Sequence, residues 1–371
     1  MQDKTEENQS LMTEGERVMN ICNACRYCEG FCAVFPAMEK RLSFADGDLR
    51  YLANLCHDCR ECYYACQYSP PHEFKINVPK ILTRIRRDSY EHYAWPASFG
   101  KIFTHPVYTL IVSMIIIPIL FIIFGIYEKG VDALTQAYTD EQGAFYQVVS
   151  HTVMASGFGM VGIFVLVAFF LGWKNFKLDM HDDETPLSNW TDVKQALKHA
   201  LSLKYLGSSG DGCTYPNDSP SLMRRYFHHF TFYGFMLCFA ATSVATIYHY
   251  LFNWPAPYSM LSLPVILGTL GGVGLIIGPS GLLYLKNIRD KKPADEMQSS
   301  SDTTLLVLLL LISVTGLLLM ILRETSWMGM LLLVHLGLVM GLFLTMPYGK
   351  FVHGIYRFGA LIRFTKEGRK S

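Results

Sequence analysis

Eight of the ten cysteines of this 371-residue chain fall within its first 66 residues, in two runs of identical spacing. The runs are Cys22, Cys25, Cys28, Cys32 and Cys56, Cys59, Cys62, Cys66. Thiols at this spacing reach three irons of one [4Fe–4S] cubane from a single loop, while the fourth thiol projects toward the other cluster. The sequence therefore predicts two clusters and a chain that carries electrons.

The spacing also predicts which thiols share a cluster. Because the last cysteine of each run serves the other cube, we expect two mixed ligand sets, Cys22, Cys25, Cys28, Cys66 and Cys56, Cys59, Cys62, Cys32. The runs superimpose at an offset of 34 residues, which also aligns Arg26 with Arg60. Structural zinc usually takes two ligand pairs separated by a longer gap, so a zinc site or a disulfide framework is disfavoured.

The segment between the two runs has a helical pattern. Leu49, Leu52 and Leu55 recur at helical spacing, with Asp46 or Asp48 as the expected N-cap. No run of alternating β-branched residues appears. We therefore expect a helical head, similar to the ferredoxin-like subunits of quinone-linked reductases.

The composition indicates a membrane protein. Hydrophobic residues make up 51% of the chain and charged residues 17%, and the apolar excess lies after residue 105. Six apolar runs are each close to the ~20 residues that a helix needs to cross a bilayer. They are residues 106–127, 147–172, 229–252, 262–285, 304–322 and 327–347. We therefore expect an all-α protein with a six-helix bundle after the head.

The loops between these runs predict the orientation. The loops at 173–227 and 286–303 and the tail from 348 carry 7, 4 and 6 basic residues, whereas the opposing loops carry 1, 0 and 1. The first 16 residues are polar and lack a signal core. We therefore expect a multi-pass protein of the bacterial inner membrane with a cytoplasmic head and cytoplasmic termini. The net charge of +1 and the absence of a basic aromatic tract argue against nucleic acid.

Histidines within the spans are the next candidates, because ionisable residues in a membrane are costly and usually functional. His151 and His249 lie near the same outer face on different helices, as the two axial ligands of haem b must. His335, about 12 Å from that face by helical rise, is an alternative to either. His229 lies 20 residues before His249 and would serve a second site, for which no partner can be named. The alternative for each histidine is a hydrogen bond to a nearby carbonyl or hydroxyl.

Other polar features receive simpler interpretations. His105, His228 and His353 lie at the cytoplasmic boundary, where a solvated or headgroup role is favoured. Cys213 and Cys238 are isolated and are interpreted as plain thiols. No GxGxxG fingerprint, catalytic triad or carboxylate pair appears, so we expect no catalytic residues here and no substrate chemistry on this chain.

These features divide the chain into four parts. They are a 2×[4Fe–4S] ferredoxin-like head at 1–74, an amphipathic linker at 75–105, a transmembrane haem-binding domain at 106–347 and a basic tail at 348–371. The glycine-rich loop at 207–221 is interpreted as a docking or quinone-adjacent loop, since it lacks the ending of a phosphate loop.

The two cysteine runs and the segment "RRYFHHFTFYGFMLCFAATSVATIYHY" resemble the tricarballylate utilisation protein B family, also known as citrate utilisation protein B. The chain is also similar to the C-terminal half of a fused flavoprotein of cobalamin synthesis, and its membrane half to the cytochrome b subunit of respiratory nitrate reductase. The resemblance implies two [4Fe–4S] clusters, haem b, and a separate FAD-dependent flavoprotein that oxidises tricarballylate to cis-aconitate and is reoxidised by this subunit.

We therefore expect electrons to pass from the flavin through the clusters and haem to a quinone in the lipid membrane. The alternative is a redox sensor or scaffold that binds clusters without turnover. A tricarboxylate transporter is disfavoured, because the spans contain almost no arginine or lysine to meet three carboxylates.

Overall fold

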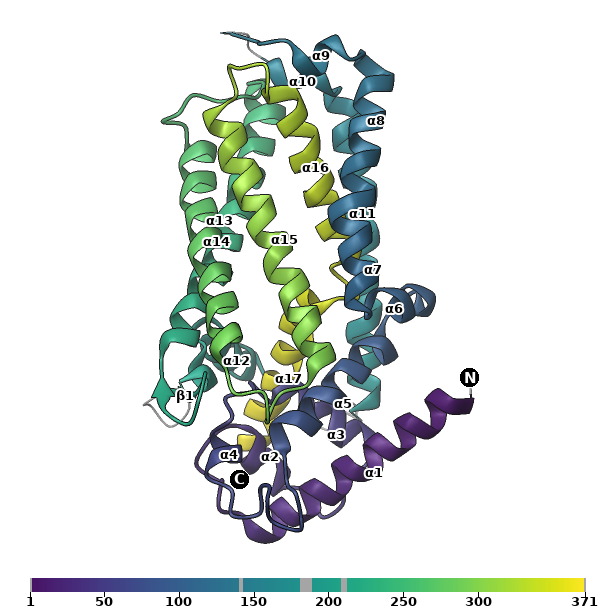
Figure 1. Cartoon of the computed structure of the whole chain (residues 1–371), viewed down its shortest axis with the longest axis vertical. Coiled ribbons are helices and arrows are strands. Elements are labelled where there is room, and N and C mark those ends of the chain that lie inside the picture. The colour runs from purple at the N-terminus through teal and green to yellow at the C-terminus, as the bar shows by residue number, and fades with distance from the viewer. Residues whose placement is uncertain (1, 140–142, 181–188, 208–211, 370–371) are drawn as a thin grey trace.

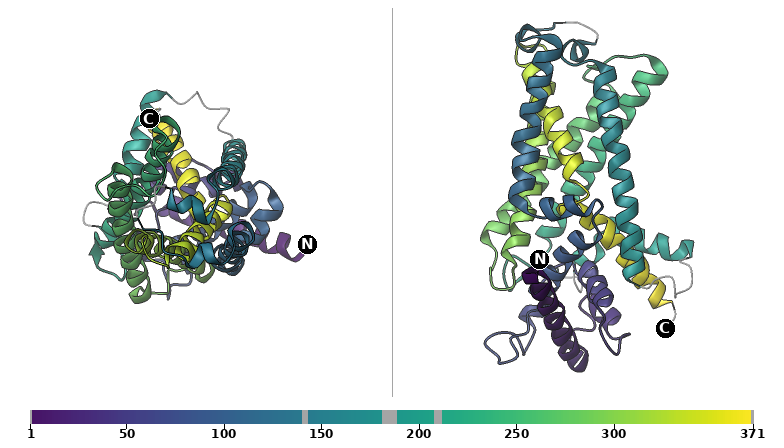
Figure 2. Two further views of the ribbon diagram at one scale, coloured as in Figure 1. Left: turned by 90° about the horizontal axis from the view of Figure 1, so that it is seen from above. Right: turned by 90° about the vertical axis from the view of Figure 1, so that its right-hand side faces the viewer.

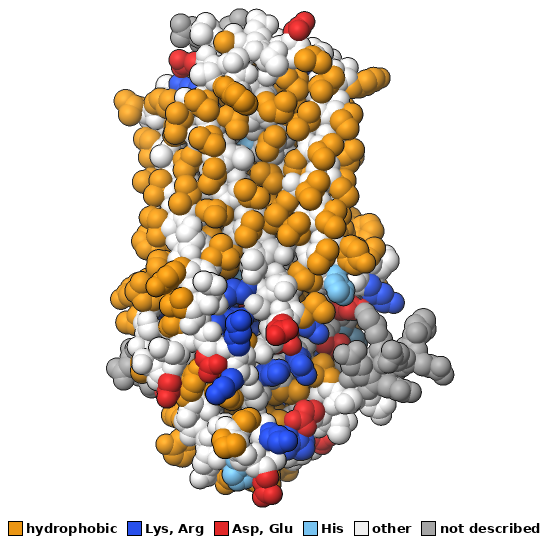
Figure 3. All heavy atoms as spheres, in the orientation of Figure 1, with side chains coloured by type: hydrophobic (Ala, Val, Ile, Leu, Met, Phe, Trp, Pro, Cys, Tyr) orange, Lys and Arg blue, Asp and Glu red, His pale blue; other side chains and the backbone are white. Residues whose placement is uncertain are grey.

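The computed structural model describes residues 2–139, 143–180, 189–207 and 212–369. A bundle of long helices stands on a smaller helical head, and both ends of the chain lie at the head (Figures 1 and 2). Figure 3 shows hydrophobic side chains covering the visible face of the bundle, whereas Lys, Arg, Asp and Glu gather mainly over the head. This distribution is that of a protein whose bundle faces lipid.

Six helical segments are long and apolar enough to cross a membrane. They are α7–η1–α8 (Pro106–Ile111, Val112–Ile116, Ile117–Lys129), α11 (His151–Asp179), α13 (Met223–Phe252), α14 (Leu263–Ile288), α15 (Glu296–Ile321) and α16 (Met328–Thr345). The predicted fold class is thereby confirmed. Two helices begin earlier than expected, α13 at Met223 and α15 at Glu296. The Asp295 side chain caps α15 by accepting from the Gln298 N–H, so this helix starts outside the apolar run.

Small residues bring α13 and α14 into backbone contact. A Cβ added to Gly271 would lie 2.8 Å from the Cys238 nitrogen and the Gly234 oxygen. Gly157, by contrast, has no atom within 4 Å of such a Cβ. The glycines of α14 therefore serve helix packing, whereas Gly157 on α11 has open space beside it.

Two short helices, α9 (Asp132–Thr135) and α10 (Ala144–Val148), lie at the end of the bundle away from the head (Figure 1). Leu134 and Val148 from these helices are buried against Met328 and Leu333 of α16. This small core fixes the loop beside the N-terminus of α11, where His151 lies.

The head is built from α1 (Gln2–Cys25), α2 (Val34–Met38), α3 (Asp46–Leu55), α4 (Glu61–Tyr64), α5 (Val78–Tyr93) and α6 (Ala97–Phe103). The helix expected between the cysteine runs forms as α3, with Leu49, Leu52 and Leu55 in the core. Its N-cap is Ala45, one residue before the expected range, and no side chain caps it. The core also takes in α5, through residues such as Leu82.

The remaining elements join the head to the bundle. They are α12 (Trp190–Leu201), η3 (Lys204–Leu206), the two-residue strands β1 (Cys213–Thr214) and β2 (Pro220–Ser221), η4 (Lys350–Val352) and α17 (His353–Gly368). The strands pair antiparallel with Cys213 opposite Ser221. Residues 208–211 of the expected docking loop lie outside the described residues.

The last helix, α17, belongs to the core of the head. Tyr356, Ala360 and Leu361 are buried there. Glu367 receives hydrogen bonds from Arg41 at 2.8 Å and from Arg363 at 2.9 Å. The basic C-terminal segment is therefore bound to the head over most of its described length.

Candidate cluster and haem sites

The first three cysteines of the first run and the last cysteine of the second line one cavity of about 240 Å³. Burial raises the pKa of Cys22 to about 12, and the neighbouring Cys66, Cys28 and Cys25 add to the rise. The structure therefore brings Cys66 to the first run, from which it is separated by more than 30 residues. Cys62 also lines this cavity.

The other four cysteines form a second set. Burial raises the pKa of Cys32 well above its ordinary value, and Cys59 and Cys56 add to the effect. The pKa of Cys62 is likewise raised by burial and then by Cys59, Cys32 and Cys56, with a smaller effect from Cys28 of the first set. The two sets of thiols are therefore neighbours.

The thiols surround space and do not converge on one point. Among the described side chains of residues 9–139, 143–180, 189–207 and 212–369, no three from Cys, His, Asp or Glu are placed to hold a single metal ion. The 240 Å³ cavity is many times the roughly 10–15 Å³ that one water molecule needs. This donor set suits a group of several atoms, and sulfur ligands are those that a [4Fe–4S] cube takes.

The repeated arginines occupy special backbone positions. Arg26 and Arg60 follow the second cysteine of their runs, and both have left-handed backbone, with φ of 55° and 69°. A residue other than glycine pays a conformational penalty there. The left-handed turn reverses the chain between the second and third cysteines, so that their thiols can face the same space. The arginine that recurs in both runs therefore occupies the same left-handed turn in each.

Arginines from three helices hold the start of the second run. Arg86 of α5 and Arg357 of α17 each donate to the Cys56 carbonyl at 2.7 Å. Arg224 of α13 donates to the Asp58 carbonyl at 2.5 Å. The second set of thiols is therefore anchored to the end of the bundle that adjoins the head.

Cys213 lies beside the second set, which the sequence did not indicate. It is fully buried, and its thiol donates to the Leu206 carbonyl at 3.0 Å. A hydrogen bond with Cys213 is the main cause that raises the pKa of Cys59, followed by burial. The hairpin of β1 and β2 therefore covers this set.

His151 and His249, which the sequence places at the same depth, are in contact in the structure. The rings of His151 on α11 and His249 on α13 are stacked, with centroids 3.6 Å apart and planes 21° apart, and the Tyr146 hydroxyl lies 3.3 Å from His249 Nδ1. Imidazole nitrogens stand about 2 Å from a bound metal, so two axial rings need centroids roughly 6 Å apart. These half-buried rings fit an axial pair in depth and must swing apart to bind iron between them.

His335 and His229 lie in other surroundings. His335 Nδ1 is 3.1 Å from the Thr315 hydroxyl on α15, the hydrogen bond that was the alternative to ligation. His229 contacts Tyr233 on its own helix, and its Nε2 is buried without a hydrogen-bond partner among the described residues.

Two boundary histidines meet instead. His228 of α13 and His353 of α17 have ring centroids 6.3 Å apart. The sequence favours a solvated or headgroup role for both, whereas the structure has both half-buried. The signal in the sequence that could have pointed to these two histidines is an arginine four residues from each. Arg224 precedes His228, and Arg357 follows His353.

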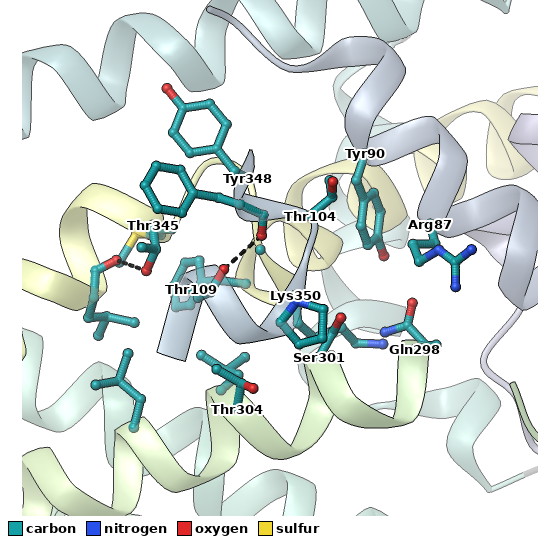
Figure 4. Close-up of a pocket in the computed structure, with 18 residues that line it drawn as sticks. Arg87, Tyr90, Thr104, Thr109, Gln298, Ser301, Thr304, Thr345, Tyr348 and Lys350 are labelled. Atoms are coloured by element: carbon teal, nitrogen blue, oxygen red, sulfur yellow. Dashed lines mark hydrogen bonds between the residues drawn. The ribbon is translucent and has the colours of Figure 1, made fainter. Parts of the chain in front are cut away.

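A small pocket of about 30 Å³ lies where the head meets the bundle (Figure 4). Arg87, Tyr90 and Gln298 lie on one side of it, while leucines of α15 and α16 supply apolar lining. Tyr90 and Gln298 are 3% and 4% exposed. The Tyr90 hydroxyl and Gln298 Oε1 have no hydrogen-bond partner among the described residues. The pocket therefore offers a hydrogen-bond donor and an acceptor beside apolar surface.

Comparisons with known proteins agree with this arrangement. Residues 106–371 match the family model of Citrate utilization protein B, and residues 15–92 match the Fer4-like domain of Citrate utilization protein B. The chain is 49% identical to Citrate utilization protein B of Escherichia coli over 359 residues, which cover 96% of this chain and 93% of that protein. No solved structure matches.

Proposed function

The chain belongs to the Citrate utilization protein B family, and from this premise we propose that it is the membrane electron-transfer component of a citrate- or tricarballylate-utilising system. It takes electrons from a partner flavoprotein similar to an FAD-dependent tricarballylate dehydrogenase. It passes them through two [4Fe–4S] clusters and haem b to a quinone. The organic acid is oxidised on the partner.

The observation that carries this proposal is the division of eight thiols into two neighbouring sets. Clusters bound there supply one-electron redox steps. The chain positions the thiols from rigid elements: α1 presents Cys22 and Cys25 from its last turn, and Cys56 directly follows α3. The fixed thiols keep the two sets close enough to exchange electrons.

The exposure of the two sets supports a direction of transfer. Beside the first set, Tyr27 lines the cavity and is 68% exposed. In the second set, Cys56 and Cys59 are buried, and arginines connect them to the bundle. We therefore place the docking face of the flavoprotein at the first set and the exit toward the membrane at the second.

The pocket in Figure 4 supports delivery to a quinone at the membrane boundary. A quinone needs a hydrogen-bond donor for its carbonyl oxygen and, once reduced, an acceptor for its hydroxyl group. Tyr90 and Gln298 offer these groups, and the apolar wall suits the ring. At about 30 Å³ the pocket holds little more than water, so entry of the ring requires side-chain movement.

His151 and His249 are the residues that would hold haem b at the outer end of the bundle. They stand at one depth on two helices, and Tyr146 orients His249. A haem held by these two histidines would lie at the end of the bundle away from the head, and it would supply one-electron redox chemistry there. The excess of basic residues in the head-side loops supports a cytoplasmic head in the inner membrane.

The test is reconstitution of the purified protein in lipid with a reduced flavoprotein and a quinone. Quinol formation that requires this chain is the expected result. A chain that binds clusters yet forms no quinol would leave the alternative, a redox sensor or scaffold.

A further inference from the structure

We propose that His228 and His353 are the axial pair of a second haem b, at the cytoplasm-facing end of the bundle beside the second cysteine set. This inference rests on the proposed function, because it assumes an electron-carrying chain that binds haem. It assigns the inner site to residues other than His229, the candidate from sequence.

The spacing of the two rings is the first argument. Two imidazole nitrogens about 2 Å on either side of one metal put the ring centroids roughly 6 Å apart. The rings of His228 and His353 have centroids 6.3 Å apart, with planes at 76°. The outer pair, at 3.6 Å, lacks this separation. The inner rings therefore already stand at the distance of an axial pair.

The ring nitrogens supply the second argument. His353 Nδ1 lies 2.6 Å from the Lys350 carbonyl, so it donates to that oxygen and leaves Nε2 as the free lone pair. A hydrogen bond from the second ring nitrogen to a carbonyl is typical of metal-binding histidines. His228 Nδ1 is buried without a hydrogen-bond partner in the described part of the chain. Buried polar atoms without partners are rare and point to a missing ligand.

The position of the pair supplies the third argument. Arg224 lies one helical turn before His228 and Arg357 one turn after His353, a rise of about 6 Å in each case. These arginines donate to the carbonyls of Asp58 and Cys56, at the second cysteine set. Both histidines therefore stand close to the thiols from which electrons would leave the head.

The charge around the pair suits the ligand. Arg357 lies near both imidazoles, Arg224 lies near His228, and Lys350 lies near His353. Haem b carries two propionates, and arginine is well suited to hold carboxylates. Lys350 is already paired with Asp302 at 2.9 Å. The two arginines are therefore the groups that would meet the propionates, in addition to bonding the cluster loop.

The experiment counts haem per chain in protein purified from membranes, by pyridine haemochrome, for His228→Ala, His353→Ala, His353→Met, His249→Ala and His229→Ala. We expect about two haems in the unaltered protein and in His229→Ala, and half that number in His228→Ala, His353→Ala and His249→Ala. His353→Met keeps its haem at a raised midpoint potential, because methionine–histidine ligation raises it. His105, a boundary histidine whose ring meets Tyr108 edge to face, supplies the matched control: His105→Ala should keep both haems.

Iron and sulfide counts show whether each variant retains a folded head. If His353→Ala loses the clusters as well, the test is the haem midpoint potential of His353→Met. A raised potential supports the inner pair, and an unchanged potential contradicts it. An unchanged haem count in His228→Ala and His353→Ala, or a loss in His229→Ala instead, overturns the inner pair. The quinol assay separates this inference from the proposed function. If the protein forms quinol but contains one haem, and only His249→Ala removes that haem, this inference is overturned while the proposed function stands.

Discussion

Replacement of Cys66 by serine tests how the two cysteine runs share their thiols. Cys66 lines the same cavity as Cys22, although it belongs to the second run. Serine keeps the shape of the side chain but is a poor ligand for iron. Because each cube would hold four irons, we expect about eight irons in the intact chain and about four in Cys66→Ser.

The double variants give the sharper measurement, because the effects of two substitutions at the same site do not add. Cys22→Ser with Cys66→Ser should still leave about four irons, since both changes remove the same cube. Cys22→Ser with Cys32→Ser should leave almost none, although both residues lie in one run. Iron and sulfide counts after anaerobic purification, with EPR of the reduced protein, measure the outcome.

The opposite pattern refutes the reasoning. If the pair Cys22 and Cys32 leaves one cube and the pair Cys22 and Cys66 leaves none, each run binds its own cluster. Cys213→Ser serves as the matched control, because Cys213 is a buried thiol beside Cys59 that belongs to neither run.

Three further changes test the packing and the pocket. Gly271→Ala should lower the free energy of unfolding by about 1–3 kcal/mol, because the new Cβ overlaps the backbone of α13; Gly157→Ala, with open space, should leave thermal unfolding in detergent unchanged. Glu367→Ala should lower the free energy of unfolding by about 2–3 kcal/mol, because the buried Arg41 loses a partner. Amide hydrogen exchange in α17 should become faster, and protection equal to that of the unaltered protein would contradict this prediction. Tyr90→Phe should raise KM for the quinone several-fold while haem and cluster contents stay constant, and an unchanged KM removes this pocket from the route.

Local sequence was sufficient for the features that depend on neighbours along the chain. The spacing of the cysteines is a property of one loop, and the helix at Leu49, Leu52 and Leu55 follows from its own periodicity. The depth match of His151 and His249 followed from counting residues along two helices, because helical rise is constant. The six spans followed from length and hydropathy, which do not require knowledge of packing.

The tertiary structure decided which side chains meet across distant segments. Nothing in the hydropathy of residues 223–252 indicates that His228 faces His353, since this depends on how α13 and α17 rotate and cross. The same holds for Cys213, which lies beside Cys59, and for Arg86, whose guanidinium donates to the Cys56 carbonyl. The sequence by itself determined the types of these residues and their depth along the helices, because local spacing sets both. The packing of whole helices determined which residues they meet, because the rotation of a helix about its axis is set only by the surfaces it contacts.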